Sequence, residues 1–195
     1  MSLEAFAKVS EATKLLVEKG FTGESVTAAI EMVGRALGVD RTLVYENPTV
    51  MRPGLRLSPL RHVWSEKPLS DSMRQAFPLH EQAPGWVEVL SRGQPMWEQT
   101  RNAPAPLRML LEAQKVKSVL LCPISMGSMN GAWWGILRLD DCQKERQWTE
   151  DLVVLNTLTR SMSNALKQDQ RRVALKETRT QLQLMMLRTA AAGTR

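Results

Sequence analysis

The sequence predicts an α+β fold in which an antiparallel sheet is combined with helices at both ends of the chain. Two observations lead to this prediction. Two short apolar runs, residues 116–124 and 132–139, flank a Gly-rich stretch at 127–131 whose glycines reach positive φ at little cost, which favours a hairpin. Helical periodicity dominates residues 4–37, ahead of the first strand, and about forty residues from Thr149 onward.

Two amphipathic helices are expected at the N-terminus. Residues 4–19 carry apolar side chains at helical spacing, and Gly20 is suited to end that helix. A second helix is expected to begin after Thr22, a good N-cap, and to end at Gly38. One apolar stripe along each helix predicts that each buries one face.

Five segments have the composition of strands. Residues 39–45 alternate in polarity and are rich in β-formers, and residues 62–66 are expected to be the second strand. Residues 95–98 form a short candidate, and the hairpin arms at 116–124 and 132–139 complete the set. Adjacent side chains of a strand point to opposite faces, so the paired tryptophans at the start of the second arm are expected to separate.

Residues 67–115 are the least regular part of the chain, because six prolines divide them into short pieces. Residues 86–90 have the pattern of one or two helical turns that end near Gly93, and residues 105–115 have that of a second short helix. Long irregular segments in compact domains often carry function. This segment is therefore a candidate for one side of a binding site.

The last element is expected to be one long exit helix. Thr149 is a good N-cap, and Glu150 and Asp151 would place negative charge at the positive end of the helix dipole. Such a helix is too long for a domain of this size to bury, which favours packing against a second copy of the chain. The residues expected to make that dimer helix are Leu155, Leu158, Met162, Leu166, Val173, Leu182 and Met186.

The net charge of +6 on 195 residues is concentrated in the C-terminal tail. Residues 1–166 hold 19 Lys and Arg against 18 Asp and Glu, whereas residues 167–195 hold seven against two. The body of the protein is therefore nearly neutral, and direct nucleic-acid binding is not expected. The basic tail is interpreted as a solvated helix face, with an anionic partner surface as the alternative.

The two cysteines, Cys122 and Cys142, are too few for a disulfide framework and lack zinc-site spacing, so both are expected to be reduced thiols. The sequence shows no N-terminal signal pattern and no apolar stretch of about 20 residues that could span a bilayer. We therefore expect a cytoplasmic protein.

Several sequence phrases, taken in order, are similar to those of one family. They are Leu37-Gly-Val-Asp-Arg41 before a strand that ends at Tyr45-Glu46, Trp86-x-x-x-Leu90-x-x-Gly93, Leu111 to Ser118 before Pro123-Ile124, and Gly135 to Cys142 with Arg146-x-Trp148. Together they resemble a GAF domain, the small-molecule sensing module of signalling proteins, over about residues 22–167. The likeness is to bacterial GAF domains that precede histidine kinases and diguanylate cyclases.

The resemblance implies a central twisted antiparallel sheet with the N-terminal and long C-terminal helices on one face. Short helices and loops would cover the other face and enclose a ligand pocket. The expected division is an N-terminal helix at 1–21, the GAF domain at 22–167, and a signalling helix or linker at 168–195. That linker would lead to a following output domain, such as a PAS, kinase or cyclase domain, so the chain is expected to be part of a longer protein.

The resemblance also indicates which residues would line such a pocket. Aromatic faces with a few polar groups suit a flat organic ligand. The candidate ligand-binding residues are Trp64, Trp86, Trp97, His62, His80, Arg101 and Cys122. The competing interpretation, which stays open, is that these tryptophans only fill the core.

The ligand itself is not identified by the sequence, and the cofactor is unknown. Bilin-binding relatives attach the chromophore through a cysteine that is often followed by histidine, but Leu79 precedes His80 here. Haem held by His62 or His80 stays an alternative. The Leu139-Asp140-Asp141 sequence only superficially matches the end of the cyclic-nucleotide pattern, and its carboxylates are expected to turn the following loop.

The predicted function is a non-catalytic sensor domain of a signal-transduction protein, of the two-component-system type. It is expected to bind a small molecule, to form a homodimer through its N- and C-terminal helices, and to signal through these dimeric coiled-coil helices. The first alternative is a ligand-free dimerisation and spacer module. The second is a thiol-dependent enzyme similar to the GAF domains that reduce methionine sulfoxide, which would need a resolving thiol. Cys122 and Cys142 lack that family's pattern.

Overall fold

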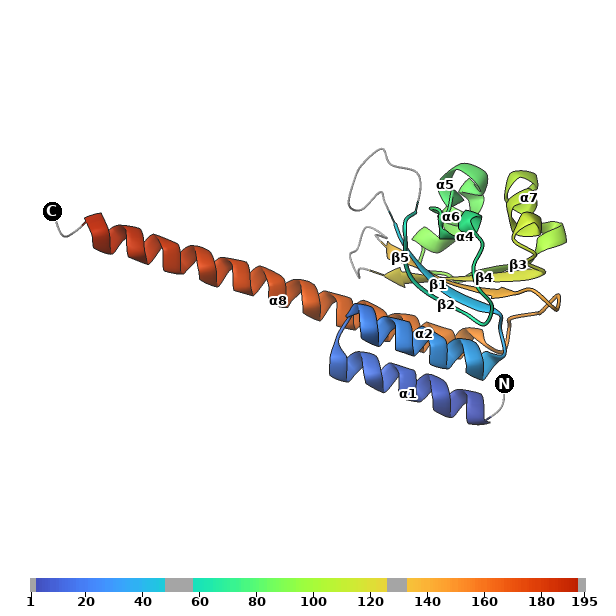
Figure 1. The fold of residues 1–195 in the computed structure, drawn as a ribbon, viewed down its shortest axis with the longest axis horizontal. Coiled ribbons are helices and arrows are strands. Elements are labelled where there is room, and N and C mark those ends of the chain that lie inside the picture. Colours follow the sequence, from blue (N-terminus) through green and yellow to red (C-terminus); the bar gives the residue numbers. More distant parts are fainter. Residues whose placement is uncertain (1–2, 48–57, 126–132, 193–195) are drawn as a thin grey trace.

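The computed structural model describes residues 3–47, 58–125 and 133–192. A five-stranded sheet of order β2-β1-β5-β4-β3 lies between long helices on one face and short helices on the other (Figure 1). All neighbouring strands are antiparallel. The strands are β1 Arg41–Glu46, β2 Leu60–Ser65, β3 Met96–Gln99, β4 Ser118–Ser125 and β5 Trp133–Asp141. The predicted α+β class and antiparallel hairpin are confirmed, while the turn expected at 127–131 lies outside the described residues.

Helices α1 (Leu3–Lys19) and α2 (Gly23–Leu37) form an antiparallel pair beside the sheet (Figure 1). Thr22 caps α2 through a reciprocal capping box with Ser25, as its side chain accepts from the Ser25 N–H at 3.2 Å. Gly38 ends α2 in the left-handed region at φ 60°, a conformation that glycine adopts without strain. The predicted caps of this helix are therefore confirmed.

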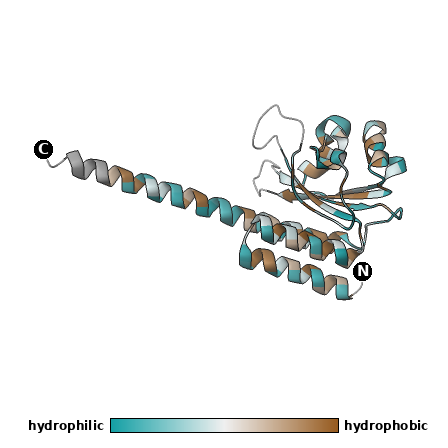
Figure 2. Ribbon diagram, viewed as in Figure 1, coloured by the Kyte–Doolittle hydropathy of each residue, from teal (hydrophilic) through white to brown (hydrophobic). Residues whose placement is uncertain are grey.

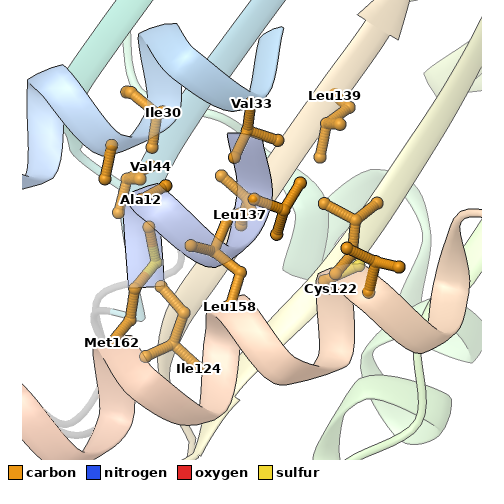
Figure 3. Close-up of a cluster of buried hydrophobic side chains, with 14 of the residues drawn as sticks. Ala12, Ile30, Val33, Val44, Cys122, Ile124, Leu137, Leu139, Leu158 and Met162 are labelled. Carbon is orange, nitrogen blue, oxygen red and sulfur yellow. The ribbon is translucent and has the colours of Figure 1, made fainter. Parts of the chain in front are cut away.

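Helices α1, α2 and the first part of α8 (Leu152–Ala192) cover the face that we call the long-helix face. The core there joins side chains of two helices and the sheet, including Ile30 and Val33 from α2, Val44 and Leu137 from the sheet, and Leu158 from α8 (Figure 3). Each of these five residues is fully buried, so the long helix is anchored to the sheet by apolar contact.

The opposite face, which we call the short-helix face, is covered by four short helices (Figure 1). Residues 67–115 thus lie where the sequence predicted, and the short strand β3 follows α6 within this segment. The helices are α4 Asp71–Arg74, α5 Leu79–Gln82, α6 Pro84–Ser91 and α7 Ala105–Ala113, with a 3-10 turn, η1, at Thr100–Asn102. A second apolar cluster fills the space between them and the sheet.

Helix α8 begins at Leu152, two residues after the first helical position that an N-cap at Thr149 predicts. Residues 149–151 form a turn instead, in which the Asp151 N–H donates to the Trp148 carbonyl at 3.1 Å. Trp148 is fully buried and Arg146 stacks on its ring. These contacts fix the position of the chain just before the helix begins. The helix then continues without a break to Ala192.

Beyond Leu166 the helix leaves the body of the protein and extends away from it (Figure 1). Apolar and polar residues alternate along this extension without a covering layer (Figure 2). Its exposed large apolar residues are Val173, Leu175, Leu182, Leu184, Met185 and Met186. Among the described residues, no helix combines the length and apolar character needed to cross a membrane.

Candidate functional site

The short-helix face holds a fully buried ion pair at the middle of the sheet. Arg138 lies on the central strand β5, and its side chain has no exposed surface. Its Nε donates to Oδ1 of Asp140 at 2.7 Å and its Nη2 to Oδ2 at 3.0 Å, so the pair is bidentate. Nη2 also donates to Oε1 of Gln114 at 2.8 Å. These bonds replace the hydration that both charges lose on burial.

A second guanidinium group approaches the same carboxylate from strand β1. Arg41 Nη1 lies 3.6 Å from Oδ2 of Asp140 and donates to the Gln114 carbonyl at 3.0 Å. Asp140 therefore lies between two cations. In the described part of the chain, neither arginine makes an ion pair with another carboxylate.

Two aromatic rings complete the surroundings of Arg138. The centroid of the Phe77 ring lies 4.8 Å from Cζ of Arg138, within the range of a cation–π contact, and 5.3 Å from the centroid of Tyr45. Burial raises the pKa of Tyr45, while the positive charge of Arg138 acts in the opposite direction. The net upward shift keeps Tyr45 a neutral hydroxyl at physiological pH.

One polar atom of this cluster is unmatched. Arg138 Nη1 is buried and has no hydrogen-bond partner among the described residues. Buried polar atoms in folded proteins almost always have a partner, and a charged donor without one is costly. Nη1 could therefore donate a hydrogen bond to a molecule bound on this face.

A second polar cluster lies at another part of the short-helix face. The rings of His80, on α5, and Trp133, on β5, stack with centroids 6.0 Å apart and an angle of 12°. Nε2 of His80 lies 3.2 Å from Oδ1 of Asn47, whose Nδ2 donates to the Trp133 carbonyl at 3.1 Å. This arrangement combines flat rings with polar groups, as ligand sites often do.

The seven residues predicted to bind a ligand are not brought together. Trp86 and His80 lie on the short-helix face, and Trp86 is buried in its apolar cluster. Arg101 lies on η1 at the surface, where it pairs with Glu145 at 3.2 Å. The other four, His62, Trp64, Trp97 and Cys122, lie on the long-helix face. Their role in binding stays a prediction, but the sheet separates them from Trp86 and His80.

Strand alternation explains this separation. His62 pairs across the sheet with Val44 and Trp64 with Thr42, and directly opposed residues share a face. Because Val44 belongs to the core beneath α2, His62 and Trp64 must point to that side as well. Trp64 consequently packs against α2, while the His62 ring meets Phe21 edge-on at 6.0 Å. Burial, followed by the charge of Arg61, lowers the pKa of His62.

The tryptophans at the start of β5 separate as predicted, Trp133 to the short-helix face and Trp134 to the long-helix face. Asp141 also acts as predicted, because its Oδ1 accepts from the N–H groups of Gln143 and Lys144 and turns the loop. Asp140 does not share that role, since its carboxylate binds Arg138 in the core. Sequence reasoning thus missed Arg138 and Asp140 as candidate site residues.

The predicted dimer-helix residues also divide into two groups. Leu155, Leu158, Met162 and Leu166 belong to the protein's own core, where they are buried against the sheet and neighbouring helices. Val173, Leu182 and Met186 lie beyond the body and are exposed. A partner helix therefore has access only to the second group.

The described residues also form hollows on the long-helix side. One of about 540 Å³ lies between α8 and the end of β4, and its lining includes Asn156, Arg160 and Ser125. Another of about 280 Å³ lies where the end of α2 meets the start of α8. No group of three or more His, Cys, Asp or Glu among the described residues could hold a metal ion.

The two thiols lie on opposite sides of the sheet. Cys122 is fully buried in the long-helix core, whereas Cys142 packs against the short-helix core. Burial raises the pKa of Cys122 to about 12 and that of Cys142 to about 11. Neither environment favours the thiolate that nucleophilic sulfur chemistry needs, and the sheet separates the two sulfurs.

The raised pKa of Cys122 predicts a loss of stability at alkaline pH. In the unfolded chain the thiol ionises near pH 8.5, whereas in the folded protein it keeps its proton to about pH 12. As pH rises from about 9 to 11, the unfolded state alone loses the proton, so the free energy of unfolding falls by up to about 1.4 kcal/mol per pH unit. Urea unfolding of wild type and Cys122→Ala at each pH measures this slope. The variant should be less stable at pH 7 but show a shallower decline, and parallel declines would contradict the prediction.

A comparison with known families agrees with this architecture. The family model described as the GAF domain matches residues 23–166, about three quarters of the chain. The chain belongs to the GAF family. The fold and family expected from the sequence phrases are therefore confirmed. GAF domains are generally regulatory and non-catalytic modules, so the family assigns this chain a sensor or regulatory role in signalling.

Among characterised proteins, this GAF domain is similar to the methanogenesis regulatory histidine kinase FilI of Methanothrix harundinacea (strain 6Ac). The two are 28% identical over 159 residues, which are 79% of this chain but 17% of the kinase. The chain thus spans about a sixth of that relative's length. The kinase's own activity lies outside what this comparison assigns to the chain.

Two solved structures illustrate the shared fold. The phycoerythrobilin-bound GAF domain from a cyanobacterial phytochrome superimposes with a TM-score of 0.70 at 16% identity, over 88% of this chain and 99% of that one. The A. aeolicus nlh2 GAF domain in an inactive state gives 0.58 at 18% identity, over 86% and 98%. At these identities the likeness concerns the fold alone.

Proposed function

We propose that this GAF domain is the non-catalytic sensory module of a larger cytoplasmic signalling protein. A small molecule binds on the short-helix face, and helix α8 carries the response to an output domain, such as a PAS, kinase or cyclase domain, in a homodimer. The similarity to a regulatory histidine kinase supports the signalling context.

The observation that carries this proposal is the continuity of α8. Within one helix of 41 residues, Leu158 and Met162 are fully buried against the sheet, whereas Val173 and Leu182 lie outside the body and are exposed. A shift of the sheet core would therefore move the outer part of the same rigid element. A ligand can bias that shift only by as much as its affinity differs between the two arrangements.

The short-helix face suits the input side of this mechanism. Helices α4 and α5 are single turns without side-chain caps, and few such elements are stable alone. Through Met73, Phe77 and Leu79 the segment that holds them covers the sheet directly. A small change at this layer therefore reaches the same sheet that holds α8 on its other face.

Deleting residues 168–195 tests the dimeric part of the proposal. We expect the full chain to be a dimer and the shortened chain a folded monomer, because the deletion removes the exposed apolar residues beyond the body. Sedimentation equilibrium over a concentration series measures both masses. The tail is strongly basic, with seven Lys and Arg against two Asp and Glu, so added salt should strengthen the dimer by screening repulsion between copies.

Point variants provide the control for the deletion. Substituting Val173, Leu182 and Met186 by serine in the full chain should weaken the dimer, whereas Met109→Ser, an equally exposed methionine on α7, should leave it unchanged. A full chain that sediments as a monomer, or a dimer that survives the deletion, would contradict the proposal.

A second candidate function is a ligand-free dimerisation and spacer module. The described part of the short-helix face favours it, because Phe77, Trp86 and Leu90 fill the space over the sheet with the protein's own side chains. Native mass spectrometry of freshly purified protein, with an absorption spectrum, distinguishes the two. A retained small molecule supports sensing, and a bare chain without any bound mass supports the spacer.

A further inference from the structure

We propose that Arg138 and Tyr45 form a recognition site for the carboxylate of a small molecule with an apolar or aromatic body. This inference rests on the proposed function, in which the short-helix face binds a small molecule, and it deepens that proposal by naming the ligand's chemical class.

The first step is the fixed orientation of Arg138. Asp140 holds Nε and Nη2 through both carboxylate oxygens, and Gln114 accepts a further bond from Nη2. Three bonds on one side of the planar group leave its Nη1 side as the free edge. That atom is buried and has no hydrogen-bond partner among the described residues, so a donor is held ready for an acceptor.

The second step is the donor beside it. The Tyr45 hydroxyl belongs to a buried side chain that interacts with the Arg138 guanidinium. A neutral phenol and a guanidinium N–H are both donors, and a carboxylate offers two acceptor oxygens. Charge favours the same ligand class, because Arg138 and Arg41 share the single carboxylate of Asp140 within ion-pair distance.

The third step concerns the walls around these donors. Phe77 stacks over the guanidinium face, and Met73 and Leu79 are buried in the same cluster. A ligand that reaches Nη1 in the guanidinium plane would therefore meet aromatic and aliphatic surface with the rest of its body. A strongly hydrated ligand body would lose its water without compensation here, whereas an apolar one would gain from burial.

Access to this site depends on the segment that covers it. Phe77 lies between the one-turn helices α4 and α5 and is tied to Ser58 by two backbone hydrogen bonds of 3.0 and 2.8 Å. Displacing this short segment would break these two bonds, expose Arg138 Nη1 and change the packing against the sheet. Ligand entry would thus displace the segment with α4 and α5, whose movement the proposed sensory mechanism requires.

Benzoate is a suitable probe, because it joins a carboxylate to a phenyl ring, and benzamide is its neutral counterpart. We would titrate each into the full chain carrying ¹³C-methyl methionine and follow the Met73 signal, with the exposed Met109 as an internal reference. Benzoate should shift the Met73 signal, and benzamide should bind at least about tenfold more weakly. Tyr45→Phe should weaken benzoate about tenfold, the loss of one hydrogen bond to a charged group.

The double variant Arg138→Met, Asp140→Leu removes the donor together with its counter-ion and should abolish benzoate binding, while Arg101→Gln, which alters a surface arginine, should not affect it. Equal binding of benzamide and benzoate, undiminished binding in Tyr45→Phe, or no shift at Met73 would each overturn the carboxylate site. If benzamide bound near Met73 as well as benzoate does, the short-helix face would still bind a small molecule, so the proposed sensory function would stand while the carboxylate site would not. The sedimentation experiment on the deletion of residues 168–195 tests the dimer separately from all these outcomes.

Discussion

Asp140→Asn is expected to lower the free energy of unfolding by about 3 to 5 kcal/mol, the usual cost of breaking a buried ion pair from one side. The substitution keeps the size of the side chain but leaves the Arg138 charge in the core without its carboxylate. No water can replace that partner at low cost, because both residues are completely buried on the central strand. Urea unfolding monitored by circular dichroism measures the change.

Two further variants identify the cause of this loss. Glu11→Gln breaks an exposed ion pair with Lys8 and should change stability by less than about 1 kcal/mol. The double variant Arg138→Met, Asp140→Leu replaces both charges by apolar groups, so it should recover at least half of the loss, although Gln114 Oε1 then lacks its donor. A double variant less stable than Asp140→Asn would show that packing rather than charge dominates at this position.

The fold was largely predictable because local signals agree with tertiary packing. Thr22 and Gly38 mark both ends of α2 by capping chemistry that needs no distant partner. The β4–β5 hairpin follows from two apolar runs of strand length. The prediction placed the start of α8 two residues too early, since residues 149–151, next to the buried Trp148, form a turn and Thr149 does not act as the N-cap.

The candidate site was much less predictable, because it depends on which face each strand presents. Register shifts at Val44/Tyr45 and at Ile124/Ser125 change the alternation of side chains, and neither has a sequence signature. Tryptophans gave a strong signal, but the sequence does not show that Trp64 and Trp97 pack beneath the long helices, away from Trp86. The useful signal was the charged Arg138 within the otherwise apolar run 132–139, since a buried charge requires a partner.

The close pairing of β1 with β5 also explains why β5 requires glycine at position 135. Gly135 lies on the central strand, where it pairs with Glu46 of β1 on one side and Ile124 of β4 on the other. A Cβ there would lie 2.2 Å from the backbone oxygen of Tyr45. Gly135→Ala is therefore expected to cost about 3 kcal/mol or more, at the upper end of overpacking effects, because two hydrogen-bonded neighbours prevent the strand from moving aside.

Two other glycines make this prediction specific. In Gly34→Ala the new methyl group would meet the Trp64 ring at 2.3 Å, but Trp64 is a partly exposed side chain that can rotate, so the loss should be smaller. Gly85 lies in α6, and a methyl group on its Cα would meet no atom within 4 Å outside its chain neighbours and the backbone of its own helix, so Gly85→Ala should be neutral or stabilising by up to about 1 kcal/mol. Thermal unfolding of the three variants should rank them in this order. If Gly135→Ala were as stable as Gly34→Ala, the β1–β5 backbone contact would have to be looser than the sheet register indicates.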